Sequence, residues 1–401
     1  MIGKEGIKYS LRNLKKSKDR SFFTILSIFI GIATIFIFVS FGLGLFSYID
    51  EISGGASADK VIIQAKGAAA PGLDTTFELT ESDLRVINGV TGVYETAGSY
   101  FRVVKLSQKD EVRYSFIISY TPDNPLILES FDIGVEKGKD LTASDSGKVI
   151  LGSNFREDGK IFSQGYEIND KIEIDDKDFR VSGFLESIGN PQDDSQTYIN
   201  EEAFQDTYPD TTSYGMIIAR VNKEQIDVVV ERIEKALRKH KDQEEGKEDF
   251  YVQSYAELLE AYSGALAGIV GFIIIIGIIS VIVAAINTAN TMITAVLERY
   301  KEIGILKAIG AKNSEILDIF LFESSFLGLI AGALGILAGF IITYVAKVIL
   351  IGMGWSFLAP LYNVWLFVGC LVFAVVTGAI SGVAPAIRAS RINTVDALRY
   401  E

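Results

Sequence analysis

Apolar residues gather in four long blocks along the 401-residue chain, and charged residues crowd between the first block and the second. Each block reaches or exceeds the roughly 20 residues that a helix needs to cross about 30 Å of hydrocarbon. The pattern therefore predicts a membrane protein with four transmembrane α-helices, over residues 21–49, 264–297, 316–350 and 364–387.

The second of these helices is predicted to be unusually long. No proline interrupts residues 256–297, and a continuous helix of that length would measure about 60 Å at 1.5 Å per residue. This is about twice the thickness of the hydrocarbon layer. We expect the excess to project from the membrane as a stalk.

The polar stretch between the first two helices, residues 50–262, is predicted to be a large extracytoplasmic domain. Strand-like and helix-like pieces interleave in it without strict alternation, which indicates an α+β fold. Strands are expected at 60–65, 101–106, 112–120, 148–152, 171–174, 179–185, 214–221 and 250–253. Helices are expected to begin at 80–83 and to occupy 154–162 and 224–241.

Charge predicts the orientation of the chain. Lys and Arg cluster before the first helix, between the second and third, and after the fourth, and such segments stay on the cytoplasmic side. Residues 50–260 hold 42 acidic and 23 basic side chains, while the whole chain has a net charge of −13. Both termini are therefore predicted to be cytoplasmic in a multi-pass plasma-membrane protein, with residues 1–20 forming an amphipathic helix on membrane lipid.

The sequence contains no enzymatic motif. No Gly-Lys pair is followed by the Ser or Thr of a phosphate-binding loop. The only cysteine, Cys370, lies in the fourth apolar block, and the only histidine, His240, has no second ligand near it, so neither a disulfide nor a zinc site is expected. We expect a protein without catalytic residues, cofactor, metal or nucleic-acid partner.

One carboxylate, Glu323, stands within an apolar block, about seven residues into the third predicted helix. A charge in that position is costly and is by default a functional candidate. Its nearness to the membrane surface leaves a second interpretation open, in which the side chain reaches the interface or bonds to Ser324 or Ser325.

Two segments carry a resemblance to a known family. Residues 297–312 read LERYKEIGILKAIGAK, and residues 382–401 read GVAPAIRASRINTVDALRYE. Both are similar, nearly residue for residue, to the signature segments of MacB/FtsX-type ABC transporter permeases. One departure is Asn393-Thr394, where the family usually has Asp-Pro, which we expect to loosen slightly the entry to the last short helix.

The resemblance implies a dimeric permease, a homodimer or a heterodimer with a related permease, that works with an ABC ATPase subunit on a separate chain, where ATP binds. It implies an extracytoplasmic domain in two parts, residues 60–120 with 214–253 near the membrane and an inserted distal part, 121–213. It also implies that the permease domain, residues 263–401, contacts the ATPase through a coupling segment, 298–312, and the tail, 388–401.

The residue types of the coupling segment agree with that role. Charges of both signs stand where a long helix leaves the membrane, and glycines permit a close approach and a turn. Anchoring to lipid headgroups explains the basic residues but not the acidic ones. The candidate coupling residues are Glu298, Arg299, Glu302, Gly304, Lys307, Gly310, Arg388 and Arg391.

Two functions remain open from the sequence. One is a permease that converts the ATPase cycle into motion of its outer domain, called mechanotransmission, for export or extraction of a substrate. The alternative is an FtsX-like membrane scaffold that regulates an extracellular partner.

Overall fold

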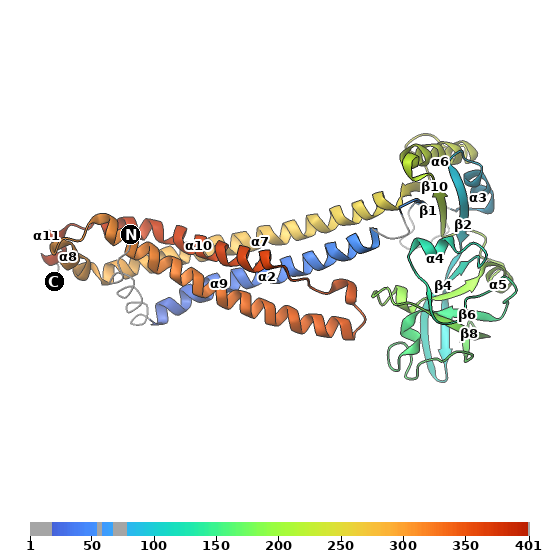
Figure 1. Ribbon diagram of the computed structural model, residues 1–401, viewed down its shortest axis with the longest axis horizontal. Coiled ribbons are helices and arrows are strands. Elements are labelled where there is room, and N and C mark those ends of the chain that lie inside the picture. The colour runs from blue at the N-terminus through green and yellow to red at the C-terminus, as the bar shows by residue number, and fades with distance from the viewer. Residues whose placement is uncertain (1–17, 54–57, 67–77, 400–401) are drawn as a thin grey trace. The chain divides into compact units, whose positions relative to one another are not determined.

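The computed structural model describes residues 18–53, 58–66 and 78–399 (Figure 1). Two compact units are present. Within the described residues, one unit, expected to be the permease domain, comprises 18–46, Ala265–Ile351 and 358–399, and the other, expected to be the extracytoplasmic domain, comprises Ser47–Gly264 with Gly352–Phe357. The amphipathic helix expected over residues 1–20 lies almost entirely outside the described residues.

The four predicted transmembrane helices are confirmed. They are α2 (Lys18–Ser53), α7 (Tyr255–Glu298), α9 (Asn313–Gly352) and α10 (Val364–Ser390). The expectation of one continuous second helix is also confirmed, because α7 runs without a break for 44 residues. At 1.5 Å per residue its length is about 66 Å.

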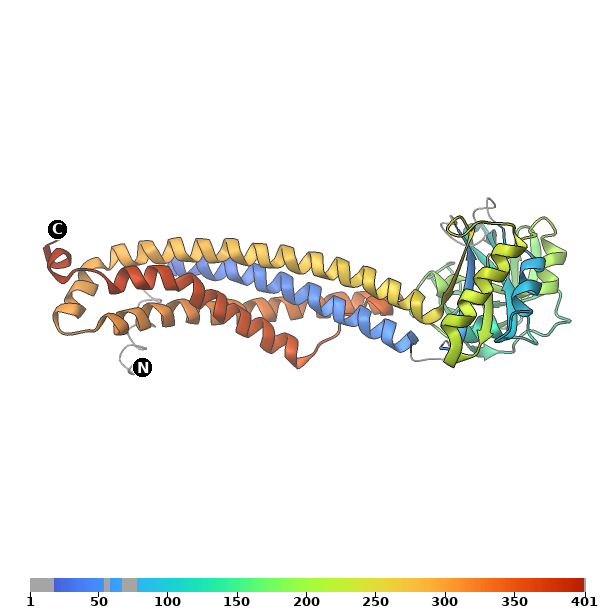
Figure 2. The ribbon, with the colours of Figure 1, turned by 90° about the horizontal axis from the view of Figure 1, so that it is seen from above.

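Small residues let these helices pack closely. Figures 1 and 2 show α2 and α7 side by side, and a Cβ added at Gly277 of α7 would lie 2.7 Å from Ile35 of α2. Between α9 and α10, a Cβ at Gly328 would lie 2.5 Å from the carbonyl oxygen of Ala374, and one at Gly378 would lie 2.5 Å from that of Ser324. Gly277, Gly328 and Gly378 are therefore packing positions.

The extracytoplasmic domain contains two sheets. A four-stranded sheet has the order β11-β1-β10-β2, and a seven-stranded sheet has the order β5-β8-β6-β9-β4-β3-β7. The strands are β1 (Lys60–Ala65), β2 (Val93–Ser99), β3 (Phe101–Gln108), β4 (Glu111–Tyr120), β5 (Val135–Gly138), β6 (Lys148–Leu151), β7 (Lys171–Ile174), β8 (Lys177–Leu185), β9 (Thr197–Asn200), β10 (Met216–Val221) and β11 (Phe250–Ser254). The helices are α3 (Glu81–Asn88), α4 (Leu126–Ser130), α5 (Glu201–Thr207) and α6 (Ile226–His240).

The predicted division of this domain is wrong at one boundary. Strands β3 and β4 were expected beside 60–65, but they belong to the seven-stranded sheet, where β4 pairs in parallel with β9 and Ile117 lies opposite Thr197. The boundary therefore falls at Tyr100, between β2 and β3, and not after residue 120. An apolar alternation shows that a segment is a strand, but it does not show which strand will be its neighbour.

A second expectation, a helix over 154–162, is also wrong. Only a 3₁₀ turn, Ser153–Arg156, forms there. Gly159 adopts a φ of +78°, and the Asp158 carboxylate accepts a hydrogen bond from the Gly165 N–H at 2.8 Å. A left-handed glycine and a carboxylate that binds the backbone further along both favour a loop over a helix.

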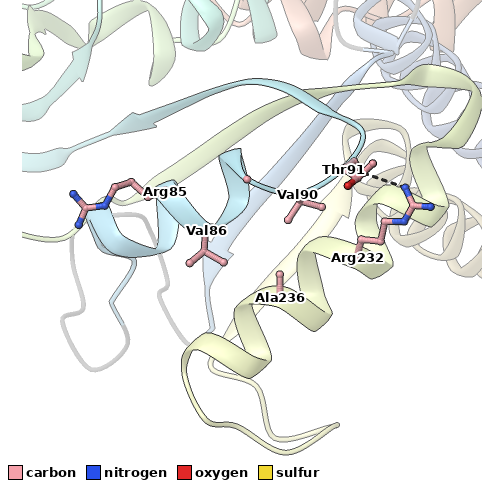
Figure 3. Close-up of a pocket in the computed structure, with 7 residues that line it drawn as sticks. Arg85, Val86, Val90, Thr91, Arg232 and Ala236 are labelled. Atoms are coloured by element: carbon pink, nitrogen blue, oxygen red, sulfur yellow. Dashed lines mark hydrogen bonds between the residues drawn. The ribbon is translucent and has the colours of Figure 1, made fainter.

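An open depression lies between α3 and α6, lined by Val86, Val90 and Ala236 (Figure 3). Arginines stand at its rim, and each already has a partner within the domain. Arg232 donates to the Thr91 carbonyl oxygen at 3.0 Å, and Arg85 pairs with Glu81 at 3.1 Å. We assign no ligand to this depression, because the domain itself neutralises or binds both cations.

Candidate coupling site

The two signature segments meet in the structure at one end of the transmembrane helices. Residues 298–312 contain the short helix α8 (Tyr300–Ala308), and residues 388–399 contain α11 (Thr394–Arg399), and we call these two segments together the coupling unit. A separate apolar core holds them against the ends of α7, α9 and α10. Its buried members are Met292, Val296, Ile303, Ile316, Phe320, Ala386, Ala389, Ile392 and Ala397.

Gly310 ends α8. Its φ is +107°, and its N–H donates to the Lys307 carbonyl oxygen at 3.1 Å. The N–H of Ala311 donates to the Leu306 carbonyl oxygen at 3.0 Å. These two bonds form a Schellman motif, in which a left-handed residue closes the helix. Glycine fits there because the left-handed conformation costs it nothing, so Gly310 redirects the chain into α9.

Gly304 allows α8 and α11 to touch. A Cβ added there would lie 2.5 Å from the Cβ of Ala397, which is fully buried. The entry to α11 is capped as well, since the Asn393 side-chain oxygen accepts from the Val395 N–H at 3.1 Å. Asn393 therefore supplies a helix cap, which offsets the loosening expected from the departure at this position.

Lys307 points into the coupling unit. Its Nζ donates to the carbonyl oxygens of Ser390 at 3.0 Å and of Ile392 at 2.6 Å, at the end of α10. The last carbonyls of a helix have no partner within it and carry partial negative charge, so a lysine there binds favourably. Lys307 thus fastens α8 to α10.

Arg299 and Glu323 form the one ion pair that brings together two of the predicted residues in the part of the chain that the structure describes. Arg299 Nη1 lies 3.2 Å from Glu323 Oε2, and Nη2 lies 3.5 Å from Oε1. The two side chains are 12% and 2% exposed. The partner of Glu323 is therefore an arginine at the junction of α7 and α8, rather than Ser324 or Ser325.

The remaining predicted residues, Glu298, Glu302, Arg388 and Arg391, are all exposed. Sequence reasoning missed three apolar side chains of the coupling unit, Ile305, Ile309 and Val395, which are 47%, 78% and 69% exposed. The sequence-based prediction considered only the charges and glycines of this segment. Only the orientation of α8 shows which of its apolar residues face outward.

Family comparisons agree with this architecture. Residues 21–236 match the MacB-like periplasmic core domain, and residues 274–394 match the FtsX-like permease C-terminal domain. The chain belongs to the MacB/FtsX-type family of ABC transporter permeases. It is a multi-pass membrane protein with a large extracytoplasmic domain, and membership of this family implies an ATPase partner.

Similar proteins come from archaea and bacteria. The ABC transporter permease MJ1507 of Methanocaldococcus jannaschii is 30% identical over 98% of this chain and 98% of its own length. The permease YknZ of Bacillus subtilis is 27% identical over 99% of both chains. The macrolide export ATP-binding/permease protein MacB of Rhodopirellula baltica is 24% identical over 97% of this chain, which spans 61% of that protein.

Proposed function

We propose that this chain is the permease subunit of an ABC transporter that couples ATP hydrolysis on a separate subunit to motion of the extracytoplasmic domain, for export or extraction of a substrate. ATP binds to the partner and not to this chain. Both termini and the coupling unit then lie in the cytoplasm of a plasma-membrane protein. The observation that carries the proposal is the coupling unit itself, a small packed body with its own core at the ends of three membrane helices.

The exposed side of the coupling unit has the composition of a docking surface. Ile305 and Ile309 project from α8, and charges of both signs, Glu298, Glu302 and Arg388, are exposed in the same unit. Interfaces commonly combine a few apolar anchors with a polar rim. Exposed ion pairs contribute only about 0–1 kcal/mol each, so the apolar anchors should provide most of the affinity.

The same proposal includes a dimer, with a second copy or with a related permease, formed through α2 and α7. Burial within the chain leaves α7 free for such a contact, since only 17% of the residues in an 18-residue apolar window of this helix are buried, the same share as in α9. Ile269, Phe272, Ile275 and Ile279 are all more than half exposed. A helix apolar on nearly all sides suits contact with lipid and with another subunit.

Co-purification with an ABC ATPase tests the proposal. The chain in nanodiscs should bind the ATPase, and Ile309→Asp or Ile305→Asp should weaken binding at least tenfold. Val228→Asp is the matched control, since Val228 is 46% exposed in the extracytoplasmic domain. Wild-type affinity in both isoleucine variants, or no ATPase binding by the wild type, would overturn the proposal.

A further inference from the structure

The turn between α8 and α9 is poorly suited to transmit a displacement of α8 to α9 through the backbone. Only residues 309–312 separate the two helices, and Gly310 among them is left-handed and exposed, with no atom within 4 Å of an added Cβ. Backbone hydrogen bonds and the packing of Ala311 against the apolar core hold this turn, while Gly310 itself makes no side-chain contact. A displacement of α8 would therefore reach α9 mainly through side-chain contacts, which include the apolar core that Ile303 shares with Ile316 and Phe320.

The Arg299–Glu323 pair is such a contact. Arg299 belongs to the α7–α8 junction, since its N–H donates to the Ala295 carbonyl oxygen of α7 and its own carbonyl oxygen accepts from Ile303 of α8. Its guanidinium reaches Glu323 in α9 through two nitrogens, at 3.2 and 3.5 Å. A bidentate ion pair of this kind restricts the relative orientation of the two side chains as well as the distance between them.

Burial of the pair argues against a docking role for Arg299. With side-chain exposures of 12% and 2%, neither charge is presented to a partner. Charges are costly to remove from water, so a buried ion pair is sensitive to the loss of either of its members. The location of the pair thus favours a function inside the subunit over one at its surface.

We propose that the Arg299–Glu323 pair is a joint that makes α8 and α9 move as one body, so that displacement of α8 by the ATPase is transmitted to α9. The inference rests on the proposed coupling function, and it assigns Arg299 and Glu323 as positioning residues rather than docking residues. Lys307 makes the corresponding link to α10.

Spin labels on α8 and α9 test the joint in the full chain in nanodiscs. Labels at Ala308→Cys and Leu329→Cys, both exposed positions, in a Cys370→Ser background should give a narrow distance distribution. Arg299→Gln or Glu323→Gln should broaden it. The exchanged pair, Arg299→Glu with Glu323→Arg, should restore the narrow distribution. Lys301→Gln, which neutralises an exposed lysine on α8, is the control and should not broaden it.

The second arm adds the ATPase and ATP. The wild-type distance should stay unchanged, both neutral variants should bind the ATPase within about twofold of wild type, and their distances should change with ATP because α8 slips past α9. A variant that is only less stable would have a lower melting temperature, and its distance between the two labels would not change with ATP.

Three results would overturn the inference. They are a narrow distribution in both neutral variants, an ATP-dependent change in the wild-type distance, and loss of ATPase binding in Arg299→Gln but not in Glu323→Gln. If the ATPase does not bind the wild type, the coupling function fails, and the arm without ATPase still decides whether the pair joins α8 to α9.

Discussion

Gly304 gives the sharpest test of the contact between α8 and α11. In Gly304→Ala the new Cβ would lie 2.5 Å from Ala397 Cβ, whereas ordinary contact begins at 3.4 Å, so α11 must move by about 1 Å. Overpacking of this kind costs about 1–3 kcal/mol. Replacing glycine by alanine within a helix stabilises the helix by about 0.5–1 kcal/mol, which offsets part of this cost. The net cost is about 0–2.5 kcal/mol, which lowers the equilibrium constant for docking of α11 by up to roughly 60-fold at 1.4 kcal/mol per factor of ten.

Protease susceptibility of the tail and ATPase affinity would both report this change. Gly304→Ala should expose the tail and weaken binding, and Gly304→Leu should do so more strongly. Ala397→Gly in the Gly304→Ala background should relieve the clash, which makes a double-mutant cycle. Gly369→Ala on α10 is the control, because nothing lies within 4 Å of its added Cβ. Equal behaviour of the Gly304→Ala and Gly369→Ala variants would refute the reasoning.

Three further predictions concern other parts of the molecule. In an ATPase binding assay, Glu302→Lys should weaken affinity more than Glu302→Ala, because it adds repulsion at an exposed position. Cysteine pairs along residues 38–45 and 271–280 should crosslink between chains on a non-reducing gel. A hydrogen bond from Lys148 lowers the pKa of Asp145, so the stability it provides is present above the ordinary carboxyl pKa and is lost as pH falls through the lowered value. Asp145→Asn should remove that part of the acid dependence in thermal unfolding.

Each of these has an outcome that contradicts it. Equal affinities for the two Glu302 variants would show that this side chain lies outside the interface. Crosslinks confined to α9 and α10 would place the dimer contact elsewhere. An Asp145→Asn protein whose melting temperature follows the wild-type pH profile would show that the pair with Lys148 adds no acid-labile stability.

The membrane architecture could be predicted from the sequence because it depends on composition over about 20 residues at a time. The four spans and the unbroken α7 followed from hydropathy and the lack of proline. Strands β7 and β8 also followed, because Asp175 and Asp176 interrupt two apolar alternations. Both residues adopt positive φ in the turn that joins the two strands as a hairpin.

Features that depend on pairing between distant residues could not be predicted. Strand β4 takes β9 as its parallel neighbour, so its sheet is decided by residues 80 positions further along the chain. Arg299, at the α7–α8 junction, and Glu323, in α9, are 24 positions apart, and the charge pattern alone suggested that the arginine faced a partner protein. Ile309 is exposed only because the α8 C-terminus turns it outward.

The glycine contacts between α9 and α10 also bear on permeation. At Gly328 and Gly378 one backbone touches the other, and the Ser324 hydroxyl occupies the space above Gly382. Because the backbones touch, no pore for water, an ion or a larger solute can pass between α9 and α10 at these positions. Any route for a solute through the membrane must therefore run outside the contact between α9 and α10.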